Sequence, residues 1–113
     1  MDTVNFNRHR PPFLAVPLFD KEETVLQVTL PTVDLQEELR AYAGTFNALL
    51  SDGDETQRAA LWDLAARLMN CNRNWLKITP EALRKKYNLV EDDLVVFFED
   101  YAAFLKRTEN AKN

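Results

Sequence analysis

Histidine and cysteine, two side chains that often serve as general base and nucleophile, are scarce in this chain. Its 113 residues include one histidine, His9, and one cysteine, Cys71. A catalytic base must be held in fixed geometry beside the group that it activates. His9 stands in a polar N-terminal stretch with no neighbouring nucleophile, and Cys71 reads as a small structural residue at a helix end. We therefore expect that the chain is not an enzyme.

Metal sites and phosphate sites require residue spacings that this sequence lacks. No group of cysteines and histidines could bind zinc. The acids Asp52, Asp54 and Glu55 do not follow the twelve-residue ligand pattern of a calcium loop. The two glycines, Gly44 and Gly53, are too few for a phosphate-binding loop. The sequence predicts no metal and no cofactor.

Two short basic segments, residues 8–10 and residues 84–86, could contact nucleic acid. The formal net charge is −4, however, and an acidic chain repels phosphate. Three basic residues also make only a few phosphate contacts. Nucleic acid is therefore a disfavoured partner, and a regulator using residues 8–10 with a helix-turn-helix around residues 84–86 stays the weakest alternative.

Any functional residue must be positioned by the secondary structure. The first predicted elements are two extended segments, residues 13–19 and 24–30, which a polar turn joins. The second segment alternates apolar and polar residues and is rich in β-branched side chains, which favours a strand. Pro17 lacks the N–H that a central strand needs, so its strand belongs at a sheet edge. This part of the chain predicts a β-hairpin.

Helical periodicity follows from residue 34 onward. The stripe from Leu35 to Leu49 predicts one helix with Asp34 as N-cap and Gly44 in its middle. Asp54 caps a second helix, which the asparagines of residues 70–74 interrupt. A Thr-Pro-Glu start at Thr79 opens a short third helix. Acidic residues 91–93 begin the fourth. The expected core consists of Leu39, Phe46, Leu61, Leu64, Leu68, Leu94 and Tyr101.

The expected fold class is therefore mainly α (α+β), an N-terminal β-hairpin followed by about four helices packed as a small bundle. We expect residues 1–12 to form a flexible arm, residues 13–107 a single helical domain with the hairpin, and residues 108–113 a frayed tail. The longest unbroken apolar run, residues 94–98, is too short to cross a membrane, and no apolar leader is visible. A cytoplasmic protein without membrane contact is expected.

The fourth helix has more apolar positions than one buried stripe needs. Val95 and Ala102 lie away from its main stripe, and aromatic residues cluster on it. A partly exposed apolar face is typical of protein-interaction surfaces, and it also favours homo-oligomers. The candidate partner-binding residues are Val95, Phe98 and Ala102, with Trp75 in a loop and Pro17 on the edge strand.

The order of elements and three stretches resemble the tail assembly chaperones of long-tailed bacteriophages. The stretches are residues 60–69 (ALWDLAARLM), residues 76–83 (LKITPEAL) and residues 93–105. The resemblance covers residues 59–106, about half the chain, and includes no diagnostic catalytic residue.

The resemblance implies a non-catalytic protein that binds the long helical tape measure protein and keeps it soluble during tail assembly. It also implies that a longer form, made by translational frameshifting, often accompanies the short one. An unrelated helical adaptor or regulatory subunit that binds a partner helix is the alternative.

Overall fold

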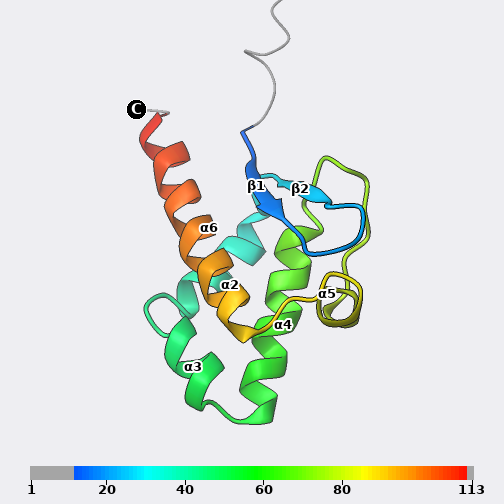
Figure 1. Ribbon diagram of the computed structural model, residues 1–113. Helices are drawn as coiled ribbons and strands as arrows, with labels where there is room; N and C mark the ends of the chain where they lie inside the picture. The colour runs from blue at the N-terminus through cyan, green and yellow to red at the C-terminus, as the bar shows by residue number, and fades with distance from the viewer. Residues whose placement is uncertain (1–11, 112–113) are drawn as a thin grey trace, which may run out of the picture.

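The computed structural model describes residues 12–111. It confirms a mostly helical fold with an N-terminal antiparallel hairpin (Figure 1). The elements are, in chain order, β1 (Leu14–Pro17), β2 (Val25–Val28), α2 (Val33–Ala41), α3 (Phe46–Asp52), α4 (Glu55–Met69), α5 (Pro80–Lys85) and α6 (Glu91–Ala111). The expected arm lies outside the described residues, apart from Pro12.

The hairpin pairs β1 with β2, so that Pro17 stands opposite Val25. The Asp20 carboxylate holds the turn by accepting from the backbone N–H and the hydroxyl of Thr24, at 2.8 and 2.6 Å. Leu26 and Val28 of β2 are fully buried, whereas Pro17 is exposed on the outer strand. The edge position predicted for the proline strand is confirmed.

Three asparagines organise the loop between α4 and α5. The Asn70 side chain bonds both backbone groups of Ile78 at 2.7 Å. The Asn72 amide donates to the carbonyls of Met69 and Leu76, and Asn74 contacts the backbone of β2. The asparagines interrupt the helix as predicted, and they also attach this loop along the hairpin.

The first predicted helix is two helices in the structure. Gly44 has a φ of 81°, a left-handed conformation that ends α2 instead of continuing it. The N-cap is Thr32, whose hydroxyl accepts from the N–H of Leu35, and not Asp34 as expected. The bundle therefore has five helices among the described residues, against about four predicted.

Helix α4 is the centre of the fold and packs against α2, α3, α5, α6 and β2 (Figure 1). Its predicted capping box between Asp54 and Gln57 is present. Seven of its side chains are buried. All seven residues of the expected core are buried, namely Leu39, Phe46, Leu61, Leu64, Leu68, Leu94 and Tyr101.

Helix α6 starts at the acidic residues 91–93, as predicted. The Asp93 carboxylate accepts a hydrogen bond from the N–H of Val90 at 2.8 Å. The buried Tyr101 hydroxyl donates to the carbonyl of Thr29 at 2.8 Å, which ties the helix to the end of the hairpin. The helix continues to Ala111, so the tail expected to fray from residue 108 is helical as far as residue 111. The Thr108 hydroxyl bonds the Phe104 carbonyl there.

Candidate functional site

The residues weighed for catalysis are not assembled into a reactive site in the described part of the chain. His9 lies outside residues 12–111. Cys71 is half-buried, and burial raises the pKa of its thiol, which disfavours the nucleophilic thiolate. No group of three or more His, Cys, Asp or Glu side chains within the described residues could hold a metal ion.

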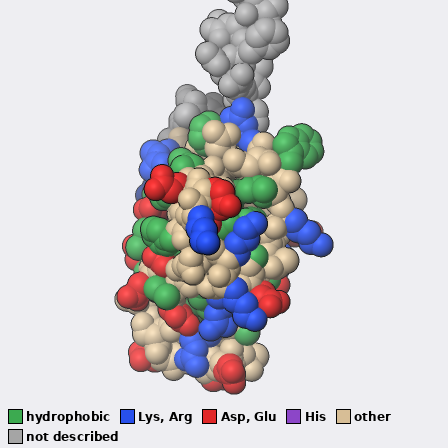
Figure 2. Space-filling model, turned by 45° about the vertical axis from the view of Figure 1, so that its right-hand side comes forward, with side chains coloured by type: hydrophobic (Ala, Val, Ile, Leu, Met, Phe, Trp, Pro, Cys, Tyr) green, Lys and Arg blue, Asp and Glu red, His purple; other side chains and the backbone are tan. Residues whose placement is uncertain are grey.

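The basic side chains around α5 are mixed with acids. Figure 2 brings the α5 side of the molecule forward and shows Lys and Arg side chains there, interspersed with Asp and Glu. Lys85 pairs with Glu81 at 3.0 Å, and the Arg84 guanidinium lies over the Trp62 ring. This arrangement lacks the one-sided positive surface typical of nucleic-acid binders.

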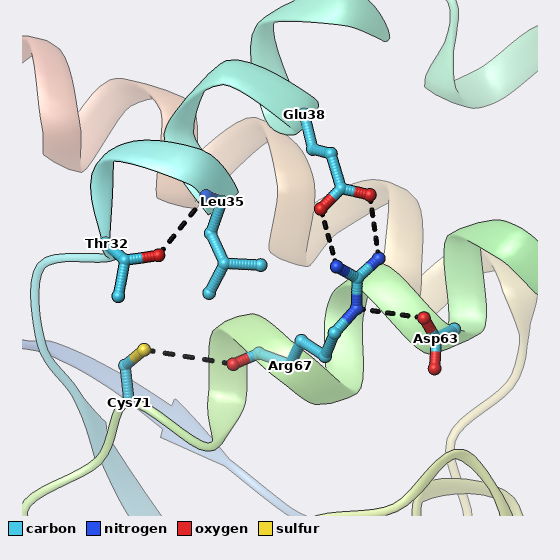
Figure 3. Close-up of polar contacts among 6 residues, drawn as sticks. All are labelled: Thr32, Leu35, Glu38, Asp63, Arg67 and Cys71. Carbon is cyan, nitrogen blue, oxygen red and sulfur yellow. Dashed lines mark hydrogen bonds and ion pairs between the residues drawn. The ribbon is translucent and has the colours of Figure 1, made fainter.

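A polar cluster joins α2 to α4 and is structural. Arg67 donates to both carboxylate oxygens of Glu38, at 2.5 and 2.8 Å, and to Asp63 at 2.9 Å (Figure 3). The hydrogen bond from Arg67 holds the pKa of Glu38 below its ordinary value. All three side chains hydrogen-bond to one another, so we assign the cluster to helix packing and not to ligand binding.

Helix α6 has a different surface on each side of its buried stripe. Residues turn by about 100° each around a helix, so Val95 and Ala102 fall on one flank and Val96 and Asp100 on the other. Ala102 on the first flank lines a groove beside α2, α3 and their connection, whereas Val95 does not line it. The second flank faces β1. The candidate residues therefore do not form one surface.

Phe98 is a core residue and does not lie on an exposed face, contrary to what the sequence had led us to expect. Its side chain is fully buried and stacks on Phe46, with ring centroids 4.4 Å apart and ring planes at 6°. The expectation failed because helical spacing does not show that α3 returns to cover this position. Val95 is half-buried against the core, and Ala102 is exposed.

The groove on the first flank of α6 is the larger apolar hollow of the two, at about 470 Å³. Its floor is formed by Leu39, Phe46 and Phe98, and small residues at its walls leave it open. We call this hollow the α2–α6 groove. Its lining residues are Gln36, Leu39, Arg40, Ala43, Gly44, Phe46, Asn47, Phe98, Glu99, Ala102, Leu105, Lys106 and Glu109.

The groove exists because α2 and α6 are held apart. No Cα of α2 lies within 8 Å of a Cα of α6. The two helices are instead joined across the opening by Glu109, whose carboxylate accepts from Gln36 at 3.2 Å and pairs with Arg40 at 3.4 Å. Both partners of this ion pair are more than half exposed, so the bridge is weak and a ligand could displace it.

The remaining candidates lie elsewhere. Trp75 is 96% exposed and has a φ of 60°, at the tip of the loop that the asparagines hold. Pro17 borders the hollow between β1 and α6. Neither residue lines the α2–α6 groove.

Sequence reasoning missed most of the α2–α6 groove. Its walls at Ala43 and Gly44 depend on the break between α2 and α3, which the apolar stripe concealed. The available signal was Gly44 itself, a poor helix former that lies in the turn just after the nine-residue helix α2.

Comparisons with known proteins identify no relative: no protein-family model, no curated protein and no solved structure matches the chain. Within the described residues, no helix has both the length and the apolar character to cross a membrane.

Proposed function

We propose that this chain is a non-catalytic binding protein that holds an amphipathic helix of another protein in the α2–α6 groove. One observation carries the proposal: a groove of about 470 Å³ lies between α6, α2 and α3, within a charged rim and above the buried side chains of Leu39, Phe46 and Phe98. Amphipathic helices bind such grooves by inserting apolar side chains spaced three or four residues apart. The groove volume falls in the range of about 300–1,000 Å³ usual for ligand sites.

The dimensions suit a short stretch of helix. From Phe98 to Glu109 the wall formed by α6 rises about 16 Å, which corresponds to three turns. Ala43, Gly44 and Ala102 are small, so a partner backbone can approach closely. Glu99, Lys106 and Arg40 around the opening can pair with the polar face of an incoming helix. The site supports a helix as ligand better than it supports a small polar metabolite.

The setting proposed for this activity is phage tail assembly in the host cytoplasm, with the tape measure protein as the ligand. Support comes from the resemblance of residues 59–106 and from a groove of a shape that binds helices. A long amphipathic helix aggregates through its apolar face unless that face is covered. A small protein that covers successive segments would keep it soluble until tail-tube subunits replace it.

The test is co-expression with a phage tape measure protein as the probe, measuring how much of that protein stays soluble. Ala102→Arg places a long charged side chain at the groove wall and should lower the soluble fraction severalfold. Ala103→Arg, at the neighbouring exposed position outside the groove lining, is the matched control and should behave as the unchanged chain does.

Circular dichroism melts must first show that both variants fold. A folded Ala102→Arg variant that still keeps the partner soluble would place the binding surface elsewhere. If the unchanged chain fails to solubilise the tape measure product but binds another protein through the same groove, the adaptor alternative replaces the chaperone.

A further inference from the structure

Within residues 12–111, no strand pairs with the outer edge of β1. The N–H of Leu18 bonds the carbonyl of Thr24 at 2.8 Å. Backbone groups alternate in direction along an antiparallel ladder, so those of Ala15 and Pro17 point away from β2. Among residues 12–111, the outward bonds of this strand are found only beyond its end, where Phe19 contacts Tyr87 and Asn88.

The opposite edge of the hairpin is closed. Thr29 donates to the Cys71 carbonyl at 2.6 Å, and Arg73 donates to the Gln27 carbonyl at 2.9 Å. The Asn74 side chain accepts from the N–H of Gln27 at 2.7 Å. The 71–74 segment thus acts as a third strand beside β2, and β1 alone keeps an edge that a further strand can join.

An apolar, acidic hollow of about 160 Å³ runs beside this open edge, between β1 and α6. Phe19 and Val96 border it and are 57% and 55% exposed. Asp93 and Asp100 provide its charge, and none of the described residues that line it is basic. A strand that fills this site should therefore carry apolar side chains together with cations.

The N-terminal segment of this chain has that composition. Val4, Phe6, Arg8 and Arg10 occupy alternate positions of residues 4–10, a part of the chain outside the described residues. In an extended chain alternate side chains share one face. Two apolar residues followed by two cations match a hollow that is apolar and negatively charged. Seven extended residues span about 20 Å, more than the roughly 13 Å of edge from Phe13 to Pro17.

We propose that residues 4–10 of a second copy of this chain add as a strand to the outer edge of β1. The apolar side chains of this strand face the apolar lining of the hollow, and its arginines face the acids Asp93 and Asp100. Pro17 limits the pairing, since it offers a carbonyl and no N–H, and this keeps the edge from joining strands indiscriminately. The surface is separate from the α2–α6 groove and does not depend on the proposed function.

A charge swap between copies tests the proposal by sedimentation velocity. Arg8→Asp/Arg10→Asp and Asp100→Arg each place like charges together, so each variant alone should self-associate at least tenfold more weakly than the unchanged chain. In an equimolar mixture the unchanged arginines of the Asp100→Arg copy meet the unchanged Asp93 and Asp100 of the other copy, so association should return between the two variants. Asp93 stays unchanged because it caps α6.

Asp92→Arg is the control, since Asp92 is an exposed acid on the same helix that lines neither hollow. It should self-associate as the unchanged chain does, and a chain lacking residues 1–11 should be monomeric. The proposal is overturned if the unchanged chain is monomeric at millimolar concentration. It is equally overturned if the mixture does not associate, or if Asp92→Arg weakens association as much as Asp100→Arg.

Discussion

The two glycines show how a single residue sets the local path of this chain. Gly44 occupies a left-handed conformation with open space where a Cβ would stand. Gly53 has an ordinary φ, but a Cβ there would lie 2.3 Å from the Leu49 carbonyl oxygen. The first glycine is required by its backbone angle and the second by the close approach of its neighbour.

Gly44→Ala should therefore destabilise the fold by about 1–2 kcal/mol, the cost of a left-handed conformation for a residue with a Cβ. If Gly44 lay in the middle of a helix, as the sequence alone predicts, the same substitution would instead stabilise the fold by roughly 1 kcal/mol. Urea denaturation of the variant decides between the two. A stabilised variant would show that α2 and α3 are one helix.

Glu38 makes stability depend on pH in a predictable direction. Its pKa in the folded chain is lowered from the ordinary value of 4.5, chiefly by the hydrogen bonds from Arg67. A carboxylate whose pKa is lower in the folded than in the unfolded chain stabilises the fold at pH values above its unfolded pKa. That stabilisation is lost as the pH falls through the folded pKa. Both side chains are over two-fifths exposed, so the contribution is below about 1 kcal/mol.

Thermal melts of Glu38→Gln should accordingly show a deficit at pH 7 that shrinks as the pH falls below about 4. Glu37→Gln, at the exposed position beside it, should show no such pattern. A deficit that is constant down to pH 2.5 would mean that the loss comes from packing and not from charge.

At the scale of elements, α4 determines stability because every other helix packs on it. Leu64→Ala should cost about 2–5 kcal/mol, the range for removing a large side chain from a closed core. Thr56→Ala, on the exposed side of the same helix, should stay within about 0.5 kcal/mol. An unchanged melt for the leucine variant would contradict the central place of α4.

The features that could be predicted from the sequence are those that depend on residues close together along the chain. The hairpin, the capping of α4 and α5, and the core stripe depend on neighbours within a few residues, and these predictions are confirmed. The break at Gly44 and the burial of Phe98 depend on how α3 turns back onto α6, a contact between distant residues. For this reason the excess of apolar residues on α6 was recognised, while the groove itself was not.

At the scale of the whole molecule, His9 and Cys71 are expected to be dispensable. The double variant His9→Ala/Cys71→Ser should keep the partner soluble as well as the unchanged chain does, because Cys71 does not line the groove and the proposed binding requires no general base or nucleophile. Soluble-partner assays on the folded variant measure this. Loss of function in that variant, with an unchanged melting temperature, would revive a catalytic or redox role.

The two flanks of α6 have a consequence for how copies could act on a long ligand. A copy that holds a helix on one flank leaves the other flank accessible to the N-terminal segment of the next copy. Neighbours on one continuous ligand would then meet at an effective concentration of about millimolar. Contacts too weak to hold singly would together form a coat, and losing the copy at one end would loosen the next. If both proposals hold, such a coat would be stable along its length and would still be removed in sequence from its end.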